Sequence, residues 1–286
     1  MKKILILGAS GMIGNGIMRE MSSNNESIVL GTYNKNFHFR NYKNFFKLDL
    51  FLEGSFKNLF HELNPNYIIN CAGITKHIDH KFTKDEVKYL NAELPHRLAK
   101  CCTENKSKLI HISSDCVFSG KKGNYSENDK TDANDLYGIT KAAGEIIDNN
   151  NITVRTSTIG FEVGSKYGLL EWFLSQDENV KGYTQAFFSG LSNYYLSRAI
   201  REIFIKKDLK GLFNVSGEKI SKYNLLKLIS KKFETGIEVI KDHNTLSIDR
   251  SLNCNKLLKQ SKYQIPKWEI MIDGLKKIYM HESIQR

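Results

Sequence analysis

The chain has 286 residues, of which 41% are hydrophobic and 26% are charged, and its formal net charge is +11. This composition excludes a wholly disordered chain, and the length predicts two domains or one large domain with an appended lobe. No apolar run reaches the roughly 20 residues that a membrane-spanning helix needs, and Gly8 interrupts the first apolar stretch before it could form a signal peptide. We therefore expect a cytoplasmic protein with no membrane contact.

The numbers and spacing of cysteines and lysines argue against metal sites and against a nucleic-acid-binding protein. The five cysteines are an odd number without a C-x-x-C pair, which indicates reduced thiols and no zinc site. The segment His77-Ile78-Asp79-His80 lacks additional ligands, so we expect no metal. Lysines occur in scattered pairs rather than in long basic runs, so we expect no nucleic-acid partner, although the positive charge would attract a phosphorylated substrate.

Strands alternate with helices along the first half of the chain. The candidate strands are 4–7, 27–33, 67–71, 109–113 and 152–156, and the helical stretches between them are 15–21, 53–63, 86–102 and 137–148. This order predicts an α/β fold with a Rossmann-type doubly wound parallel sheet. Further on we expect helices at 169–174 and 194–205, a short strand at 211–216, a helix capped by Ser221 and a closing helix from Trp268.

A glycine-rich loop follows the first strand and opens the first helix. Its sequence is Gly8-Ala9-Ser10-Gly11-Met12-Ile13-Gly14, a G-x-x-G-x-x-G spacing. Glycines at these places allow a tight turn and close approach to a pyrophosphate, which the helix N-terminus attracts. We therefore expect an NAD(P)-binding domain over 1–158, to which a segment near 183–207 returns. The rest, 159–286, is expected to form mainly a smaller C-terminal α/β lobe that binds substrate.

Other cofactor contacts are expected where later strands end. The end of the second strand carries no acidic residue but has Lys35, with Arg40 beyond, which favours NADPH over NADH because a lysine can pair with a 2′-phosphate. NADH remains an alternative. Asp49 is placed to accept a hydrogen bond from the adenine amino group, and Leu50 is placed to pack on the ring. Small residues after the fourth strand would let the backbone lie against the cofactor; they are Cys71, Ala72 and Gly73.

A tyrosine and a lysine four residues apart, Tyr137 and Lys141, fall on one face of the expected helix 137–148. A nearby ammonium is expected to lower the pKa of a phenol, so that the phenol exchanges a proton with a carbonyl oxygen. Ser114 ends an apolar strand at the same sheet edge as the glycine loop, where a hydroxyl can orient that oxygen. Asn91 is either an ordinary polar helix residue or part of a network behind Lys141.

Four segments together carry a family resemblance. They are the glycine loop, Asn70-Cys71-Ala72-Gly73, Ser113-Ser114-Asp115-Cys116-Val117-Phe118-Ser119-Gly120 and Tyr137-Gly138-Ile139-Thr140-Lys141. The set resembles the extended short-chain dehydrogenase/reductase superfamily. Within it, the stretch 111–145, followed by Arg155-Thr156-Ser157, resembles the dTDP-4-dehydrorhamnose reductase family. The resemblance extends over essentially the whole chain and is specific up to about residue 157.

The resemblance implies NAD(P)H-dependent reduction of the 4-keto group of a nucleotide-linked 6-deoxy sugar, in deoxysugar biosynthesis for surface polysaccharide. Ser114, Tyr137 and Lys141 would be catalytic: Tyr137 would protonate the new alkoxide, and Lys141 would bind the nicotinamide ribose. With Asn91, Tyr137 and Lys141 would also contact the cofactor. The substrate would meet Ser114 and Asp115.

Three further positions bear on the substrate. Cys116 stands where the family usually has a tyrosine, and Thr158 stands where an aromatic residue is common. Both changes widen the expected pocket unless a neighbour such as Trp172 refills it. The substrate is therefore either dTDP-4-dehydrorhamnose or a bulkier UDP-2-acetamido-2,6-dideoxy-4-keto sugar.

Two other functions remain open. The first is another nucleotide-sugar enzyme of the superfamily, an epimerase or a dehydratase. A dehydratase needs an acid-base pair, and here Cys116 stands beside Asp115 where a glutamate is expected. The second is a non-catalytic NADP-binding regulatory subunit, like the one known for methionine adenosyltransferase, against which the intact Ser114, Tyr137 and Lys141 argue. The oligomeric state is left open, with a homodimer as one expectation.

Overall fold

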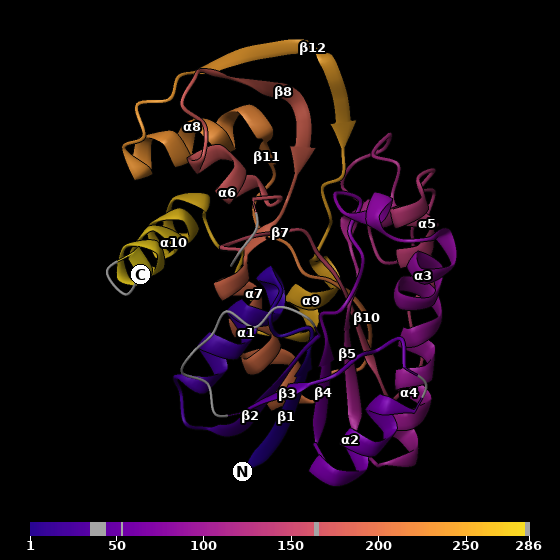
Figure 1. Ribbon diagram of the computed structural model, residues 1–286. Helices are drawn as coiled ribbons and strands as arrows, with labels where there is room; N and C mark the ends of the chain where they lie inside the picture. The colour runs from indigo at the N-terminus through magenta and orange to yellow at the C-terminus, as the bar shows by residue number, and fades with distance from the viewer. Residues whose placement is uncertain (35–43, 53, 163–165, 284–286) are drawn as a thin grey trace.

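The computed structural model describes residues 1–34, 44–52, 54–162 and 166–283, and within these ranges a seven-stranded parallel sheet forms the centre of the molecule. The strand order is β10-β6-β5-β4-β1-β2-β3 (Figure 1). The strands are β1 (Lys2–Leu7), β2 (Ser27–Tyr33), β3 (Phe45–Lys47), β4 (Tyr67–Asn70), β5 (Lys108–Ile112), β6 (Ile152–Arg155) and β10 (Gly211–Asn214). From β1 the chain adds β2 and β3 on one side of the sheet, and it then crosses over to add β4, β5 and β6 on the other side. This reversal of direction between β1 and β4 confirms the predicted Rossmann-type doubly wound fold.

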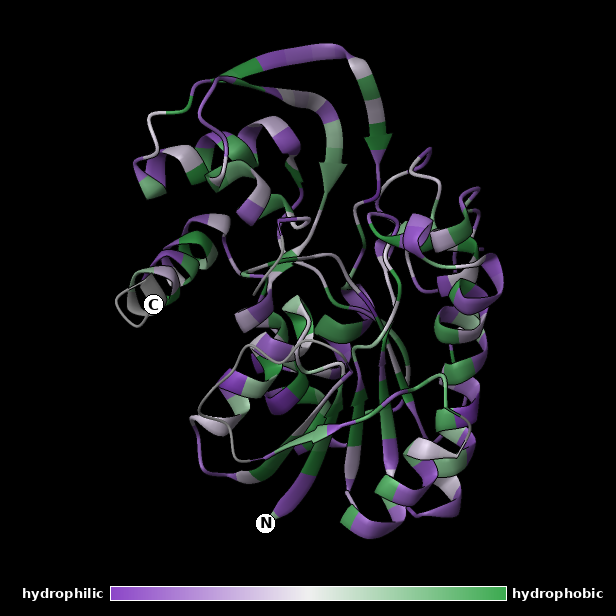
Figure 2. Ribbon diagram, viewed as in Figure 1, coloured by the Kyte–Doolittle hydropathy of each residue, from purple (hydrophilic) through white to green (hydrophobic). Residues whose placement is uncertain are grey.

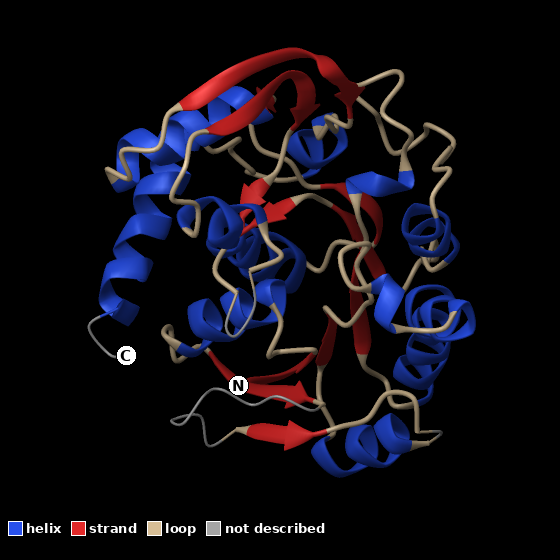
Figure 3. Ribbon diagram, turned by 45° about the horizontal axis from the view of Figure 1, so that its top comes forward, coloured by secondary structure: helices blue, strands red, loops and turns tan. Residues whose placement is uncertain are grey.

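Both faces of the sheet are covered, as the uninterrupted apolar run in β1 predicts. Ile4 and Ile6 belong to the core under α1 (Met12–Ser22) and α7 (Asn193–Ala199). Leu5 and Leu7 point the other way, into the core under α2 (Ser55–Leu63) and α4 (Leu94–Glu104). Figure 2 shows the apolar colouring of the central strands, and Figure 3 shows helices on both sides of the sheet.

A smaller lobe lies above the carboxyl ends of the central strands (Figure 1). It contains a three-stranded sheet in the order β11-β8-β12. Its elements are α6 (Leu169–Leu174), β8 (Val180–Phe188), β11 (Ile220–Ser221), α8 (Lys222–Phe233), β12 (Val239–Asp249) and α10 (Trp268–Ser283). Ser221 caps α8 as expected, since its side chain accepts a hydrogen bond from the Asn224 amide at 3.2 Å. Because the lobe lies above the carboxyl ends of the central strands, it faces the sheet edge where ligands bind in such folds.

Several segments join the two parts. α7 and the π-helical turn Ile200–Ile205 return to the first part, where α7 packs against α1. Strand β10 completes the large sheet beside β6. The short strands β7 (Thr158–Ile159) and β9 (Leu191–Ser192) pair with each other, and α9 (Asn255–Gln260) packs near β10. In the part of the chain that the structure describes, no helix has both the length and the apolarity to cross a bilayer.

Three expected helices differ from the structure, and one of them, 194–205, is divided between α7 and the π-helical turn Ile200–Ile205. The stretch 86–102 lies within α3 (Lys84–Lys88), a π-helical turn (Tyr89–Glu93) and α4. The helix expected over 137–148 is α5 (Leu136–Ala143), and its end is fixed by packing. A Cβ on Gly144 would lie 2.1 Å from the main-chain oxygen of Asn91 in the π-helical turn, so the chain passes this point without a side chain. After Gly144 the chain leaves the helix, and the Ile146 amide donates a hydrogen bond to the hydroxyl of Thr153 in β6 at 3.1 Å.

Candidate active site

Ser114 lies just beyond β5, at the carboxyl edge of the sheet. The Ser113 amide, one residue past the end of β5, donates a hydrogen bond to the Val154 oxygen of β6 at 2.8 Å. The strand pairing therefore holds this edge in place. Ser114 then caps the short 3-10 turn Asp115–Val117, where its Oγ accepts a hydrogen bond from the Cys116 amide at 3.1 Å. The side chain is 7% exposed. The serine hydroxyl is therefore fixed in position at the mouth of the sheet.

The N-terminal turn of α5 is held tightly against the Ser114 turn. Asp135 caps this helix by accepting a hydrogen bond from the Gly138 amide at 2.6 Å. A Cβ on Gly138 would lie 2.2 Å from the Cys116 carbonyl oxygen, so only glycine permits this approach. Tyr137 precedes Gly138, and its phenol lies close enough to the Ser114 hydroxyl for the serine to lower the phenol's pKa. The structure thus brings together a serine and a tyrosine that are 23 residues apart in the sequence.

The pKa of Tyr137 differs from the expectation. Burial raises this pKa above its usual value of about 10, the neighbouring Cys116 adds to the rise, and the nearby Ser114 hydroxyl opposes it. The expected lowering by Lys141 is wrong for the protein in this state, because burial dominates and the lysine ammonium bonds elsewhere. At neutral pH Tyr137 is therefore a neutral phenol that can donate a proton.

Lys141 lies on the same helix, buried beneath the site. Its Nζ donates to the main-chain oxygen of Ile112 at 2.7 Å, and the side chain is 4% exposed. Burial lowers the pKa of Lys141 from 10.5 to about 8, while Glu145 and Cys71 oppose the change. Glu145 itself is held by Arg155 through two bonds of 2.7 Å, one from Nε and one from Nη2. The ammonium is thus held between β5 and the residues that follow β4.

The glycine loop has the geometry that a pyrophosphate requires. Gly8 has a φ of +73°, and a Cβ on Gly14 would lie 2.3 Å from the Gly8 oxygen. Gly11 is the N-cap residue of α1, and no side chain of the described residues caps this helix. The first amides of α1, which include those of Met12 and Ile13, therefore remain available to an anion at a helix N-terminus. The loop fits the phosphates of a dinucleotide.

The end of β4 lies beside this loop. A Cβ on Gly8 would lie 3.0 Å from the Ala72 nitrogen, so the two backbones are in contact. Asn91 bonds Ile74 twice, accepting from its amide at 2.9 Å and donating to its oxygen at 2.8 Å, and it also donates to Thr140 of α5 at 3.3 Å. Asn91 therefore fixes the chain that follows Cys71, Ala72 and Gly73, and a network that reaches Lys141 stays a prediction.

The expected adenine contacts lie at the end of β3. Asp49 is exposed, and its Oδ1 accepts a hydrogen bond from the Phe51 amide at 3.0 Å. Leu50 is 8% exposed and packs in the core beneath α2. Lys35 and Arg40 lie outside the described residues.

Four other residues are expected to contact substrate, and of these Asp115 and Cys116 contact Ser114 directly. Asp115 is 6% exposed, and burial raises its pKa. Burial raises the pKa of Cys116 to about 11, which keeps the thiol neutral and unsuited to act as a nucleophile. The Thr158 hydroxyl is buried without a hydrogen-bond partner among the described residues. Trp172 is 37% exposed on α6.

Sequence reasoning missed two contributors from the lobe. Arg250 follows β12, and its Nη1 lies 3.5 Å from the Cys116 sulfur. Lys222, the first residue of α8, is close enough to Asp115 to oppose the rise in its pKa. Neither residue belongs to a motif, and both lie more than 100 positions from Cys116 in the sequence. Only the packing of the lobe over the sheet edge brings them to the site.

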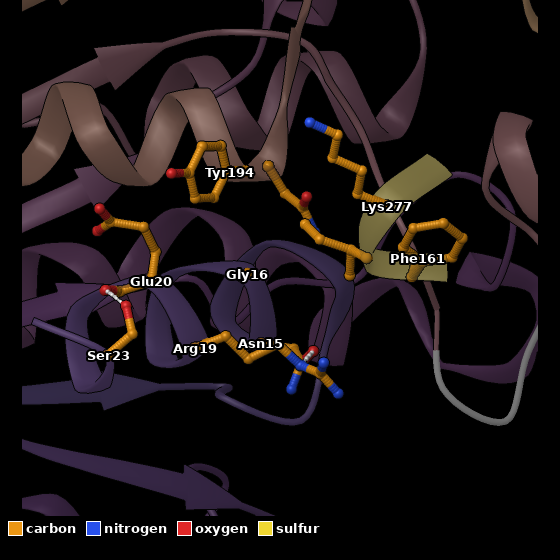
Figure 4. Close-up of a pocket in the computed structure, with 10 residues that line it drawn as sticks. Asn15, Gly16, Arg19, Glu20, Ser23, Phe161, Tyr194 and Lys277 are labelled. Carbon is orange, nitrogen blue, oxygen red and sulfur yellow. Dashed lines mark hydrogen bonds between the residues drawn. The ribbon is translucent and has the colours of Figure 1, made fainter. Parts of the chain in front are cut away.

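A separate cavity of about 400 Å³ lies between α1, α7 and the end of α10 (Figure 4). Its lining includes Asn15, Arg19, Tyr194 and Lys277, and none of the residues expected to bind cofactor or substrate. Across the described part of the chain, no group of three or more His, Cys, Asp and Glu side chains is arranged to hold a metal ion.

Comparison with known proteins gives relatives that include a regulatory subunit and reductases. The beta subunit of methionine adenosyltransferase 2 from Pongo abelii is 26% identical over 279 residues, 90% of this chain and 81% of the relative. A dTDP-4-dehydrorhamnose reductase from Aggregatibacter actinomycetemcomitans is 25% identical over 229 residues, 76% of this chain and 74% of the relative.

Solved structures share the fold over nearly the whole chain. A hypothetical dTDP-4-dehydrorhamnose reductase from Sulfolobus tokodaii has a TM-score of 0.79 at 26% identity, covering 94% of this chain and 98% of the other. A dTDP-4-dehydrorhamnose reductase from Bacillus anthracis, in complex with NADP, has a TM-score of 0.80 at 21% identity, covering 96% and 98%. The family model described as RmlD substrate binding domain matches residues 1–278, and the chain belongs to that family.

Proposed function

We propose that this protein is an NAD(P)H-dependent reductase of the 4-keto group of a nucleotide-linked 6-deoxyhexulose, acting in the cytoplasm in deoxysugar biosynthesis for surface polysaccharide. One observation carries the proposal. The approach of Gly138 to Cys116 places the neutral phenol of Tyr137 against Ser114, while Lys141 of the same helix is buried between β5 and the end of β4. A carbonyl reductase needs these three groups at one place.

The three residues divide the chemistry between them. Ser114 orients the carbonyl oxygen of the substrate through its hydroxyl, which the Cys116 amide already fixes. Tyr137 donates its proton to the oxygen that becomes an alkoxide, and the raised pKa of the phenol keeps that proton in place until then. Lys141 binds the ribose next to the reacting ring. A bound NADPH supplies the hydride.

Main-chain amides hold the central pyrophosphate of the cofactor, and side chains hold its adenosine end. The amides after Gly11 receive the pyrophosphate. Asp49, which is exposed, receives the adenine amino group, whereas the Leu50 side chain is committed to the core beneath α2. Lys35 pairs with the 2′-phosphate and favours NADPH over NADH. The reductase from Bacillus anthracis with NADP, and the enzyme WbmH from Bordetella bronchiseptica with NAD+, support both cofactors within this fold.

The sugar is proposed to lie among Asp115, Cys116, Thr158 and Trp172. The Thr158 hydroxyl supports this placement, because a buried hydroxyl without a partner in the described residues lacks a hydrogen bond that a sugar can provide. The small side chains of Cys116 and Thr158 leave room for either a 2-hydroxy or a 2-acetamido substituent. Both dTDP-4-dehydrorhamnose and a UDP-linked 2-acetamido-2,6-dideoxy-4-keto sugar are therefore candidate substrates.

A regulatory role is the second candidate, and it rests on the extent of one similarity. The methionine adenosyltransferase beta subunit matches 90% of this chain, against 76% for the reductase from Aggregatibacter actinomycetemcomitans. Such a role would not require turnover. An epimerase or dehydratase of the same superfamily has no comparable support here.

Turnover separates the candidates. The purified protein is mixed with NADPH and with dTDP- or UDP-linked 4-keto-6-deoxy sugars, and the absorbance of the reduced cofactor is followed while products are assigned by NMR. The reductase oxidises NADPH in proportion to a 4-hydroxy product. Binding of NADPH without oxidation on every sugar would refute the reductase and favour the regulatory subunit. Tyr137→Phe serves as the control for adventitious oxidation.

A further inference from the structure

A glutamate and an arginine form a buried ion pair near the carboxyl ends of β5 and β6. Arg155, the last residue of β6, donates from Nε to Glu145 Oε1 and from Nη2 to Glu145 Oε2, each at 2.7 Å. The Ser113 hydroxyl also donates to Glu145 Oε1, at 2.8 Å. The side chains of Arg155 and Glu145 are 3% and 4% exposed. Glu145 therefore accepts three hydrogen bonds in a place closed to solvent.

The ion pair and Lys141 are attached to the same short segment at the end of β5. Lys141 Nζ donates to the main-chain oxygen of Ile112 at 2.7 Å, and the next residue, Ser113, donates its hydroxyl to Glu145. Glu145 also follows Lys141 by four residues, and Gly144 between them keeps a helical φ of −85°. Side chains at this spacing lie on one side of a helix, so the carboxylate and the ammonium are neighbours.

The charge on Lys141 depends on this neighbour. Burial lowers the pKa of Lys141 to about 8, and Glu145 is the largest influence in the opposite direction. Cys71 is the other group that opposes the fall, and burial raises the pKa of its thiol to about 12, which keeps it neutral. Glu145 is therefore the carboxylate that favours the ammonium. Without it, Lys141 would lose its proton closer to neutral pH.

A purely structural role would not require these polar groups. A buried ion pair can often be replaced by apolar side chains of similar volume without loss of stability. The ends of β5, α5 and β6 could therefore be joined here by packing alone. The ion pair supplies one thing that packing does not, which is a fixed negative charge next to a buried ammonium.

We propose that Glu145 is a positioning residue for Lys141: fixed by Arg155 and Ser113, its carboxylate keeps the Lys141 ammonium charged where the ribose of the cofactor is expected to bind. The inference rests on the proposed function for the role of Lys141 as a ribose ligand. It requires cofactor binding but not turnover. Glu145 acts through Lys141 and has no need to touch the cofactor itself.

Cofactor binding as a function of pH tests the proposal. The dissociation constant of NADPH is measured by its fluorescence between about pH 6.5 and about pH 9.5 for the wild type, Glu145→Gln and Glu145→Asp. Wild-type binding should weaken as the pH rises through about 8, where Lys141 loses its proton. Glu145→Gln keeps the shape and removes the charge, so this midpoint should fall by about one pH unit or more. Glu145→Asp keeps the charge, and its midpoint should lie closer to that of the wild type.

The other titratable groups around Lys141 should not contribute in this pH range. Burial lowers the pKa of His111, on β5, well below its usual value. Burial raises the pKa of Cys71, after β4, to about 12, and it raises the pKa of Tyr137, on α5, above its usual value of about 10. A midpoint between pH 7 and pH 9 that moves with the charge at position 145 therefore reports on Lys141.

A matched control removes a carboxylate elsewhere. Glu104→Gln changes an exposed residue at the end of α4 and should leave the wild-type curve unchanged. A folded Glu145→Gln protein with the wild-type midpoint would overturn the proposal, whatever its stability. So would wild-type NADPH binding that does not vary between about pH 7 and about pH 9.5.

A double variant keeps the test decisive if Glu145→Gln does not fold, since that change leaves Arg155 without its partner. Glu145→Gln combined with Arg155→Met removes both charges of the ion pair. Among the described residues, the groups that shift the pKa of Lys141 are Glu145 and Cys71, so the double variant should still show the lower midpoint. An unchanged midpoint in this variant would overturn the proposal.

The outcome is separable from that of the proposed function. A protein that binds NADPH with this pH dependence but reduces no sugar keeps the positioning role and removes the reductase. A protein that reduces a 4-keto sugar, and whose Glu145→Gln variant keeps the wild-type midpoint, keeps the reductase and removes the positioning role. Absence of NADPH binding at every pH would overturn both.

Discussion

Replacing Lys141 with methionine should stabilise the free protein at neutral pH, although it removes a residue of the proposed catalytic site. Burial lowers the pKa of Lys141 from 10.5 to about 8, and each pKa unit corresponds to about 1.4 kcal/mol. The folded state therefore disfavours the ammonium by about 3 kcal/mol. Methionine fills similar space without charge, but the 2.7 Å bond to Ile112 is lost, which offsets about 1–2 kcal/mol. A net gain of about 1–2 kcal/mol remains.

The gain should depend on pH in a definite direction. Below pH 8 the lysine is charged in both the folded and the unfolded state, so the wild type bears the full burial cost. Between pH 8 and 10.5 the folded state loses its proton while the unfolded state keeps it, so the wild type gains stability as pH rises. The variant has no such group. Its advantage should therefore be largest near neutral pH and should shrink or reverse toward pH 10.5.

Urea unfolding of both proteins near pH 7 and near pH 10, without cofactor, measures the difference directly. Lys227→Met, on an exposed position of α8, is the matched control and should stay within about 0.5 kcal/mol of the wild type at both pH values. A Lys141→Met protein that is less stable than the wild type near pH 7, or whose stability difference is the same at both pH values, would refute the burial argument.

Four further substitutions test the site. Tyr137→Phe should lower kcat about 10²- to 10⁴-fold with unchanged NADPH affinity, and a wild-type kcat would exclude Tyr137 as the acid. Gly138→Ala places a Cβ 2.2 Å from the Cys116 oxygen, so it should cost about 1–3 kcal/mol in urea unfolding and lower kcat, whereas unchanged stability would contradict the close approach. Cys116→Ser keeps the volume and should leave kcat/KM nearly unchanged; inactivation of the folded variant would show that the thiol has a chemical role. Lys35→Ala should raise KM for NADPH about tenfold or more and barely change it for NADH, and equal effects would transfer the assignment to Arg40.

The strands of the large sheet were predictable because each contains a short apolar run that indicates a strand without knowledge of its neighbours. β2 spans Ser27–Tyr33 as expected, and β1, β4, β5 and β6 differ only at their ends. The long edge strand β12 was missed, since it alternates poorly and most of its residues are exposed or half-buried. It pairs with β8, which precedes it by more than 50 residues, so its partner cannot be read from its own composition.

The parts of the site that strand order and helical spacing alone bring together were predictable. Parallel strands end at one edge, so Ser114 and the glycine loop had to meet there, and helical spacing placed Tyr137 and Lys141 on one face. The pKa of Tyr137 was predicted in the wrong direction, because burial is a property of packing. Arg250 lies 134 residues from Cys116, and nothing in the sequence indicates their contact.

The state of Lys141 also bears on the choice between a reductase and a regulatory subunit. A fold that only needed to fill this space between β5 and α5 would be better served by an apolar side chain, because a buried ammonium lowers stability. Here the ammonium is nearly inaccessible, its pKa is about 8, and it is held by Ile112 beside Cys71 at the end of β4. A ribose hydroxyl at this place would give it a hydrogen-bonding role that packing does not explain. The reductase hypothesis accounts for the buried charge, and the regulatory hypothesis does so only if the protein still binds the same cofactor.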